Sequence, residues 1–178
     1  MKEIVKPLMQ WYAKHARTLP WRSDPTPYHV WLSEIMLQQT RVEAVIGYYD
    51  RFLEELPDVQ SLAAVSEERL LKLWEGLGYY NRARNLQKAA VQICEQYQGK
   101  FPESYEEWLA LPGIGAYTAG AVTSIAFGKK EAAVDGNVYR IYTRLYADDT
   151  EISKTAFQRN VRETIKEALP EGADSIRR

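Results

Sequence analysis

The sequence predicts an all-α fold, and three observations support this prediction. Apolar residues recur at the three- and four-residue spacing of a helix face along most of the chain. No segment shows the apolar–polar alternation of a half-buried strand. Prolines, glycines and capping residues divide the chain into roughly ten helices. The first apolar stripe consists of Ile4, Val5, Leu8, Met9 and Tyr12.

The helices of the first half have recognisable ends. Thr26 followed by a proline is typical of an N-cap and a first helical position, and it predicts a helix over 27–38. A second apolar stripe runs over 42–56 and stops at Pro57. Ser66 precedes two glutamates, which favour the N-terminus of the next short helix.

The second half continues the same pattern. A helix over 81–97 is expected to stop at Gly99. The segment 104–107, SYEE, has the form of a capping box and starts another helix. A small-residue helix follows over 117–127, and Ser153 is the expected cap of the last helix.

The composition predicts an ordered protein of one domain or two small lobes. The 178 residues are 46% hydrophobic and 12% aromatic, which is enough for a sizeable core. No run of about 18 apolar residues occurs, which argues against a membrane span. The charged N-terminal stripe does not have the form of a signal peptide. We therefore expect a cytoplasmic protein, associated with the nucleoid if its source is bacterial.

The charge balance limits the classes of partner. A net charge of −1 and an isoelectric point near 6.2 argue against a general binder of polyanions. A local basic face is still sufficient for nucleic-acid binding. The segment 76–93 contains Arg82, Arg84 and Lys88 and no acidic residue. Such a patch is suited to phosphate contacts.

The sequence offers no obvious metal ligands. Cys94 is the only cysteine, so neither a disulfide nor a cysteine-based metal cluster can form within the chain. Its apolar helical position predicts a buried core thiol. His15 and His29 lack the spacing of a ligand pair, and we expect both to be structural, with no metal site.

The segment 111–122, LPGIGAYTAGAV, is the most informative stretch of the chain. Gly113 and Gly115 form a turn whose backbone can approach a partner closely, because neither residue carries a Cβ. A helix begins directly after the turn, and its free N–H groups favour an anion such as phosphate. Helix, tight turn and helix together indicate a helix-hairpin-helix that holds a DNA backbone. A simple connection without a ligand is the structural alternative.

Three blocks resemble one enzyme family. LPGIGAYTAGAV followed by VDGNV is similar to the helix-hairpin-helix DNA glycosylase superfamily. PWR, YHVWLSEIMLQQTRV and LWEGLGYYNRARNL narrow the resemblance to MutY-type adenine DNA glycosylases, over about residues 11–169. The resemblance implies a six-helix barrel over 23–133 that ends in the hairpin. It also implies a discontinuous second lobe from 1–22 and 134–178, with the catalytic cleft between the two.

The resemblance also assigns catalytic roles. Glu34 is the expected acid, whose burial in an apolar helix would raise its pKa. Asp135 is expected either to stabilise the cationic sugar electrostatically or to attack it as a nucleophile. Asn137 would orient a carboxylate or water. Tyr117 stands where relatives resembling endonuclease III carry a lysine, which implies a glycosylase without lyase activity. From the residues alone, Glu34 could be a surface position and Asp135 an ordinary N-cap.

Other residues are expected to contact an opened duplex. The resemblance implies that Gln39 wedges into the base stack, that Gln38 and Thr40 contact nearby bases, and that Tyr79 inserts beside the partner base. A solvated helix end is the alternative for the glutamines, and core packing is the alternative for the tyrosine. Trp21 and Arg22 are expected to line the adenine pocket, although tryptophan is more often a core residue. The expected DNA-binding set is Gln38, Gln39, Thr40, Tyr79, Arg82, Arg84, Gly113 and Gly115.

The function implied by the resemblance is base-excision repair. A monomeric enzyme would hydrolyse the glycosidic bond of adenine paired with 8-oxoguanine or guanine in double-stranded DNA. No cofactor is expected in this chain, because the family's cysteines for a 4Fe–4S cluster lie beyond residue 178. The family's domain that reads 8-oxoguanine also lies there, so we expect weak lesion discrimination from residues 1–178 alone. The alternatives are a glycosylase for another base and a catalytically silent DNA-binding module.

Overall fold

The computed structural model describes residues 1–170, and within them it contains eleven helices and no strand. This confirms the all-α class. The last part of the predicted second lobe, 171–178, lies outside the described residues. The helices are α1 (Lys2–His15), α2 (Pro20–Ser23), α3 (Pro27–Leu37), α4 (Val42–Glu55), α5 (Val59–Ala64), α6 (Glu67–Trp74), α7 (Asn81–Tyr97), α8 (Tyr105–Leu109), α9 (Ala116–Phe127), α10 (Gly136–Tyr146) and α11 (Thr155–Ala168).

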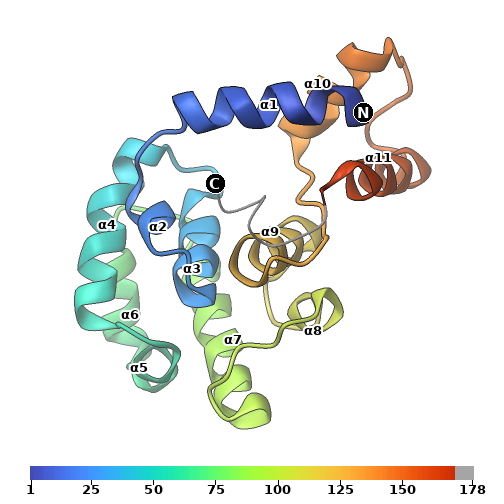
Figure 1. Cartoon of the computed structure of the whole chain (residues 1–178). Helices are drawn as coiled ribbons and strands as arrows, with labels where there is room; N and C mark the ends of the chain where they lie inside the picture. Colours follow the sequence, from blue (N-terminus) through green and yellow to red (C-terminus); the bar gives the residue numbers. More distant parts are fainter. Residues whose placement is uncertain (171–178) are drawn as a thin grey trace.

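The main hydrophobic core is built around α3 and α9. These two helices contact each other, and both are apolar on nearly all sides, which is typical of helices buried within a core. Helices α4, α7 and α8 pack around them (Figure 1). The largest fully buried side chains of this cluster include Trp31, Trp74, Trp108 and Phe52.

A second, smaller cluster joins α10 and α11. It consists of the buried side chains Tyr142, Phe157 and Val161, with Met1 and Ile165 packed against it. In Figure 1, α1 runs across the top of the molecule to α10, and α11 lies beside them. The N-terminal helix therefore reaches the C-terminal helices, and the chain forms two hydrophobic clusters joined by the segment after α9.

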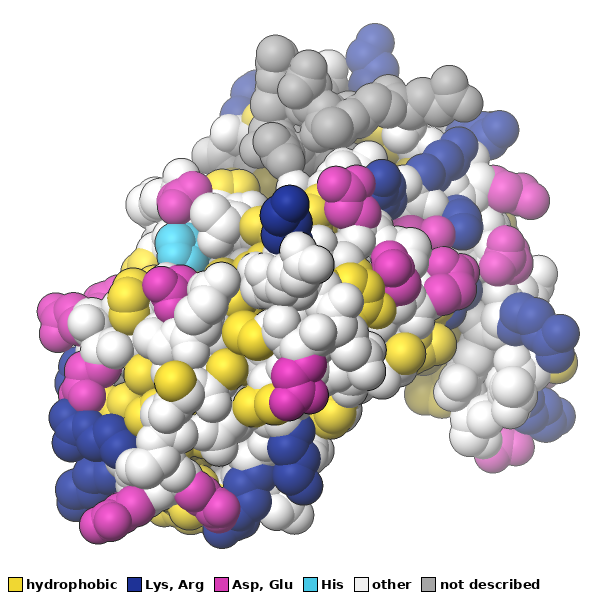
Figure 2. Space-filling model, turned by 90° about the horizontal axis from the view of Figure 1, so that it is seen from below, with side chains coloured by type: hydrophobic (Ala, Val, Ile, Leu, Met, Phe, Trp, Pro, Cys, Tyr) yellow, Lys and Arg dark blue, Asp and Glu magenta, His cyan; other side chains and the backbone are white. Residues whose placement is uncertain are grey.

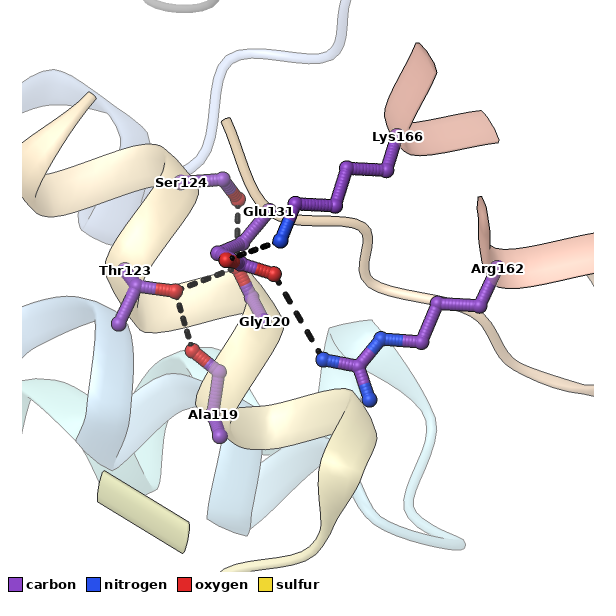
Figure 3. A network of polar contacts seen from close by, with 7 residues as sticks. All are labelled: Ala119, Gly120, Thr123, Ser124, Glu131, Arg162 and Lys166. Atoms are coloured by element: carbon purple, nitrogen blue, oxygen red, sulfur yellow. Dashed lines mark hydrogen bonds and ion pairs between the residues drawn. The ribbon is translucent and has the colours of Figure 1, made fainter. Parts of the chain in front are cut away.

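That joining segment is held at two points. An added Cβ at Gly120 of α9 would lie 2.5 Å from the Ala132 carbonyl oxygen, so the segment packs directly on the helix backbone. One carboxylate oxygen of Glu131 accepts a hydrogen bond from Lys166 Nζ at 2.7 Å, and the other lies 3.6 Å from an Arg162 nitrogen. Figure 3 shows the carboxylate between these two α11 cations, beside α9.

Most of the predicted helix starts are confirmed. Thr26 Oγ1 accepts from the backbone N–H of His29 at 3.2 Å, and Ser66 Oγ caps α6 in the same way. Ser104 and Glu107 form the expected reciprocal capping box. These side chains satisfy N–H groups that a helix start leaves without partners.

Two sequence-based expectations differ from the structure. The prediction that Ser153 caps the last helix is wrong, because α11 begins at Thr155 after Lys154 and the Ser153 hydroxyl instead donates to the Glu151 carboxylate. This local hydrogen bond competes with capping. Cys94 packs against the core but is only partly buried, with Sγ 3.9 Å from the Val59 carbonyl oxygen. Among the described helices, none is both long and apolar enough to cross a membrane.

Candidate active site

An open pocket of about 480 Å³ brings together residues that lie far apart in the sequence. Its volume lies within the range typical of small-molecule sites. Most of the side chains that line it come from α2, α3, the turn after α3, α9 and the N-cap of α10, and others come from α1, the segment before α2, and α4. Seven of the predicted site residues are among them: Trp21, Arg22, Glu34, Gln38, Gln39, Tyr117 and Asp135.

Glu34 is the carboxylate that reaches the pocket from the buried helix α3. Its neighbours Ser33 and Ile35 are buried, so this helix has no solvated face on which a glutamate could simply lie. Burial is the main cause that raises the pKa of Glu34, and the negative charge of Asp135 raises it further. A carboxylic acid in such surroundings keeps its proton to a higher pH and can donate it.

Tyr117 partners this acid from the first turn of α9. Its hydroxyl hydrogen-bonds the Glu34 carboxylate, and this bond lowers the pKa of Glu34, opposing part of the effect of burial. Burial is the main cause that raises the pKa of Tyr117, and the charge of Glu34 adds to it. The tyrosine therefore stays a neutral phenol that donates a hydrogen bond and cannot act as an amine nucleophile.

Asp135 is the N-cap of α10, and it also lines the pocket. Its Oδ1 accepts from the backbone N–H groups of Asn137 at 3.0 Å and Val138 at 2.9 Å. The side-chain amide of Asn137 donates to Oδ2 at 2.8 Å, and its own oxygen accepts from Arg140. The capping role and the site role thus coexist, because three hydrogen bonds hold the carboxylate in one orientation.

The glycine turn lies before α9, outside the pocket. Gly113 has a positive φ of 75°, and an added Cβ would lie 2.6 Å from that of Asn85, so this position requires glycine. Gly115 is the N-cap of α9, is exposed, and has open space where a Cβ would be. No side chain caps this helix. Its free N–H groups are the feature expected of a phosphate site.

The two predicted insertion residues lie at exposed, strained turns. Gln39 has φ 57° and Tyr79 has φ 47°, and they are two of only four non-glycine residues with positive φ within 1–170. Such a backbone costs about 1–3 kcal/mol per residue and concentrates at functional sites. Tyr79 is 66% exposed, so the alternative of core packing is wrong for this residue.

The arginines of the basic segment are engaged within the protein. Arg82 donates to five backbone carbonyl groups, which is a different role from the predicted phosphate contact. Arg84 pairs with Glu67, its Nε lying 2.7 Å from the carboxylate oxygen. In Figure 2, Lys and Arg side chains are interspersed with Asp and Glu side chains over the face shown, among hydrophobic and uncharged side chains. The net charge balance thus extends to this face.

Several residues of the pocket wall are not apparent from sequence reasoning. Arg17, just before α2, supplies a second cation beside Arg22, whose guanidinium donates to the Arg17 carbonyl at 3.3 Å. Its neighbour in the LPWR block, Leu19, is buried against the same pocket. A basic residue close before that block is the only signal that could have identified Arg17. The remaining wall residues are Tyr12, Val30, Ser33, Leu37, Val42 and Ile125.

The sequence matches one known superfamily. Residues 32–167 match the family described as HhH-GPD superfamily base excision DNA repair protein, and the chain belongs to this superfamily. The chain is 46% identical over 149 residues to an adenine DNA glycosylase of Mus musculus, covering 79% of this chain and 29% of that protein. It is 45% identical over 141 residues to one of Buchnera aphidicola, covering 79% of this chain and 40% of the relative. The chain thus spans less than half of these curated relatives.

Solved structures show the same architecture. A thermostable thymine-DNA glycosylase superposes with a TM-score of 0.88 at 27% identity, covering 99% of this chain and 82% of that one. An endonuclease III–DNA covalent intermediate gives a TM-score of 0.77 at 27% identity, covering 99% and 84%. These matches confirm the helix-hairpin-helix glycosylase fold.

The residues present do not fit an iron–sulfur cluster. A cluster held by four cysteines needs ligands that this chain lacks, since Cys94 is its only cysteine. Within residues 1–170, no group of three or more His, Cys, Asp or Glu side chains is arranged to hold a metal ion.

Proposed function

We propose that this chain carries the catalytic centre of an adenine DNA glycosylase in base-excision repair. The observation that supports it most is the pairing of two carboxylates of unlike surroundings across one pocket. Glu34 is half-buried with a raised pKa, and Asp135 is held by backbone and amide hydrogen bonds. Two titratable groups in such different environments favour an assignment of one as acid and the other as anion. The adenine DNA glycosylases among the relatives support the choice of base.

The proposed reaction begins with proton transfer. Glu34 donates its proton to a ring nitrogen of an adenine that has been rotated out of the duplex into the pocket. The glycosidic bond then breaks, and adenine leaves with the bonding electron pair and the added proton. Trp21 and Arg22 line the wall that the base would contact.

The sugar is left as an oxocarbenium-like cation. The Asp135 carboxylate, oriented by Asn137, stabilises this positive charge in the same way as the second carboxylate of a glycosidase. Water then adds its hydroxyl to the sugar carbon, and the remaining proton returns to a carboxylate of the site. The product is an abasic site on an intact strand.

The phenol at position 117 supports the proposal that the strand stays intact. Strand cleavage by this fold class requires an amine that attacks the sugar, and Tyr117 supplies none. Position 117 carries a hydroxyl group where an amine would be needed, and this hydroxyl forms a hydrogen bond with Glu34. The enzyme is therefore a hydrolase without lyase activity.

The proposed substrate is double-stranded DNA with adenine opposite 8-oxoguanine or guanine, bound by a monomer. Gln38, Gln39 and Thr40 lie at the mouth of the pocket and on the adjoining turn, where an opened duplex would contact them. Tyr79 lies on a second exposed turn, and Gly115 leads the helix that would bind a phosphate. Two solved neighbours are endonuclease III structures with DNA, which supports DNA as the partner of this fold.

A panel of duplexes tests this proposal. Single-turnover reactions would contain adenine opposite 8-oxoguanine, adenine opposite guanine, thymine opposite guanine, or an oxidised pyrimidine, each with and without alkali. We expect strand breaks only with adenine substrates and only after alkali. Release of thymine would favour the second candidate, a thymine glycosylase, which the TM-score of 0.88 to a thymine-DNA glycosylase supports. Breaks without alkali would contradict the absence of lyase activity.

A further inference from the structure

We propose that Arg82 is a positioning residue that locks the turns 38–40 and 76–80 into one unit before DNA binds. This inference rests on the proposed function, since the turns are those assigned to DNA insertion. Arg82 itself is half-buried at the start of α7 and lies between them.

The first set of contacts holds the end of α3. One terminal nitrogen of Arg82 donates to the backbone carbonyls of Ile35 at 2.9 Å, Met36 at 3.0 Å and Gln38 at 2.6 Å. The last carbonyls of a helix have no partner within the helix, and a cation at this end is favourable. Arg82 therefore acts as the C-terminal cap of α3, and the strained Gln39 follows directly after this cap.

The second set of contacts holds the other turn. The second terminal nitrogen donates to the carbonyls of Leu77 at 2.9 Å and Gly78 at 3.2 Å, and to Thr40 Oγ1 at 3.4 Å. The guanidinium carbon also lies 5.7 Å from the centre of the Tyr79 ring. One rigid fork thus connects the backbone carbonyls directly before each of the two strained residues.

This arrangement explains why the residue is an arginine. Its planar fork carries two donating nitrogens at a constant separation, one for each turn, whereas a lysine has a single donor atom. Because these nitrogens already serve carbonyl groups, the side chain stabilises the surface that meets DNA without being a phosphate contact. Its loss should release both turns together.

As a consequence, the contributions of Gln39 and Tyr79 to duplex insertion and adenine release depend on Arg82. In the wild-type protein both residues are presented at once, so little ordering remains when the duplex opens. Without the fork, each turn relaxes out of its strained conformation, and the side chain it carries no longer points reliably at the duplex. Truncating that side chain then costs little more.

A double-mutant cycle tests the coupling. The variants are Arg82→Met, Arg82→Lys, Gln39→Ala, Tyr79→Ala and their pairwise combinations, with Arg69→Met as the matched control. Arg69 is an exposed arginine paired with Glu55, away from the pocket. The readouts are single-turnover adenine release and the fluorescence of 2-aminopurine next to a tetrahydrofuran abasic analogue, which reports insertion without any chemistry.

We expect Arg82→Met and Arg82→Lys each to lower both readouts by about tenfold, the size typical of residues in one network. Arg69→Met should match the wild type. Adding Gln39→Ala or Tyr79→Ala to an Arg82 variant should then change little. If the losses multiply as for independent sites, or if the Arg82 variants behave like Arg69→Met, the clamp is contradicted.

Two controls keep this outcome interpretable. Thermal unfolding separates misfolding from misplacement, and if Arg82→Met does not fold, Arg82→Lys retains the charge and carries the same cycle. The abasic-analogue readout does not require adenine release. If the wild type inserts into the analogue but releases no adenine, the proposed function fails while the clamp can still be judged.

Discussion

At the scale of single residues, the chemistry depends on the environment that each carboxylate receives. Glu34 faces the pocket from a helix without a polar side, so burial raises its pKa. Asp135 accepts three hydrogen bonds from N–H groups, which hold its carboxylate in one orientation. The hydroxyl of Tyr117 lowers the pKa of Glu34 and so opposes part of the effect of burial. A tyrosine at this position supplies no amine to the site.

The hydrogen bond between Tyr117 and Glu34 predicts how adenine release depends on pH. In Tyr117→Phe the hydrogen bond that lowers the pKa of Glu34 is lost, so that pKa should rise further. Adenine release by the protonated acid then persists to a higher pH before it declines. The measurement is the single-turnover rate against pH, with Tyr97→Phe as a control away from the pocket. An unchanged or downward-shifted decline would contradict the assignment.

At the scale of elements, the site depends on how closely the segment 128–135 packs on α9. Gly120 lets the Ala132 carbonyl approach the helix backbone, and this contact lies three residues before Asp135. The Thr123 and Ser124 hydroxyls in the next turn donate to carbonyls of α9 itself at 2.7 Å (Figure 3), so they do not compete for the segment.

Substituting this glycine tests the packing. Gly120→Ala would place a methyl group 2.5 Å from a backbone oxygen, so the segment must move. We expect a loss of about 1–3 kcal/mol in the free energy of unfolding, and slower adenine release. Gly47→Ala is the matched control, because it lies in α4 with nothing within 4 Å of its added Cβ, and it should stabilise by about 0.5–1 kcal/mol. Denaturant unfolding of both variants separates the cases, and equal stability of the two would contradict close packing.

At the scale of the whole molecule, the two hydrophobic clusters must keep one orientation for the two carboxylates to share a pocket. Glu131 contributes through Lys166 and Arg162 of α11, and Arg162 also lies 3.9 Å from the centre of the Tyr105 ring in α8. This small network connects α8, the segment after α9, and α11. The Glu131 side chain is only 15% exposed, so solvent screens its ion pairs less than an ordinary surface pair.

Replacing the Glu131 carboxylate with a neutral amide should lower the stability of the molecule. Glu131→Gln leaves two cations without a counter-charge, and we expect a loss of about 1 kcal/mol in the free energy of unfolding, with the difference shrinking in high salt. The control is Glu103→Gln, whose partner Lys129 lies in an exposed pair. Urea unfolding at low and high salt measures both. A salt-independent loss, or none, would contradict an electrostatic connection.

Features formed by neighbouring residues can be predicted from the sequence more easily than contacts between distant segments. The N-caps at Thr26, Ser104 and Asp135 followed from neighbouring residues, because a cap is formed within one turn. The burial of Glu34 depends on the helices that pack around α3, and these contacts are not visible in the local sequence. Arg82 could not be assigned from the sequence, because its hydrogen bond to the Ile35 carbonyl joins residues 47 positions apart. A basic segment predicts charge but not which acceptors the fold will supply.

The role of Glu34 as the acid can be measured directly. Single-turnover release of adenine opposite 8-oxoguanine should be compared for the wild type, Glu34→Gln and Glu54→Gln, an exposed glutamate on α4. We expect Glu34→Gln to lower the rate by about a hundredfold to ten-thousandfold, while Glu54→Gln matches the wild type and all three fold. A folded Glu34→Gln that releases adenine at the wild-type rate would contradict it.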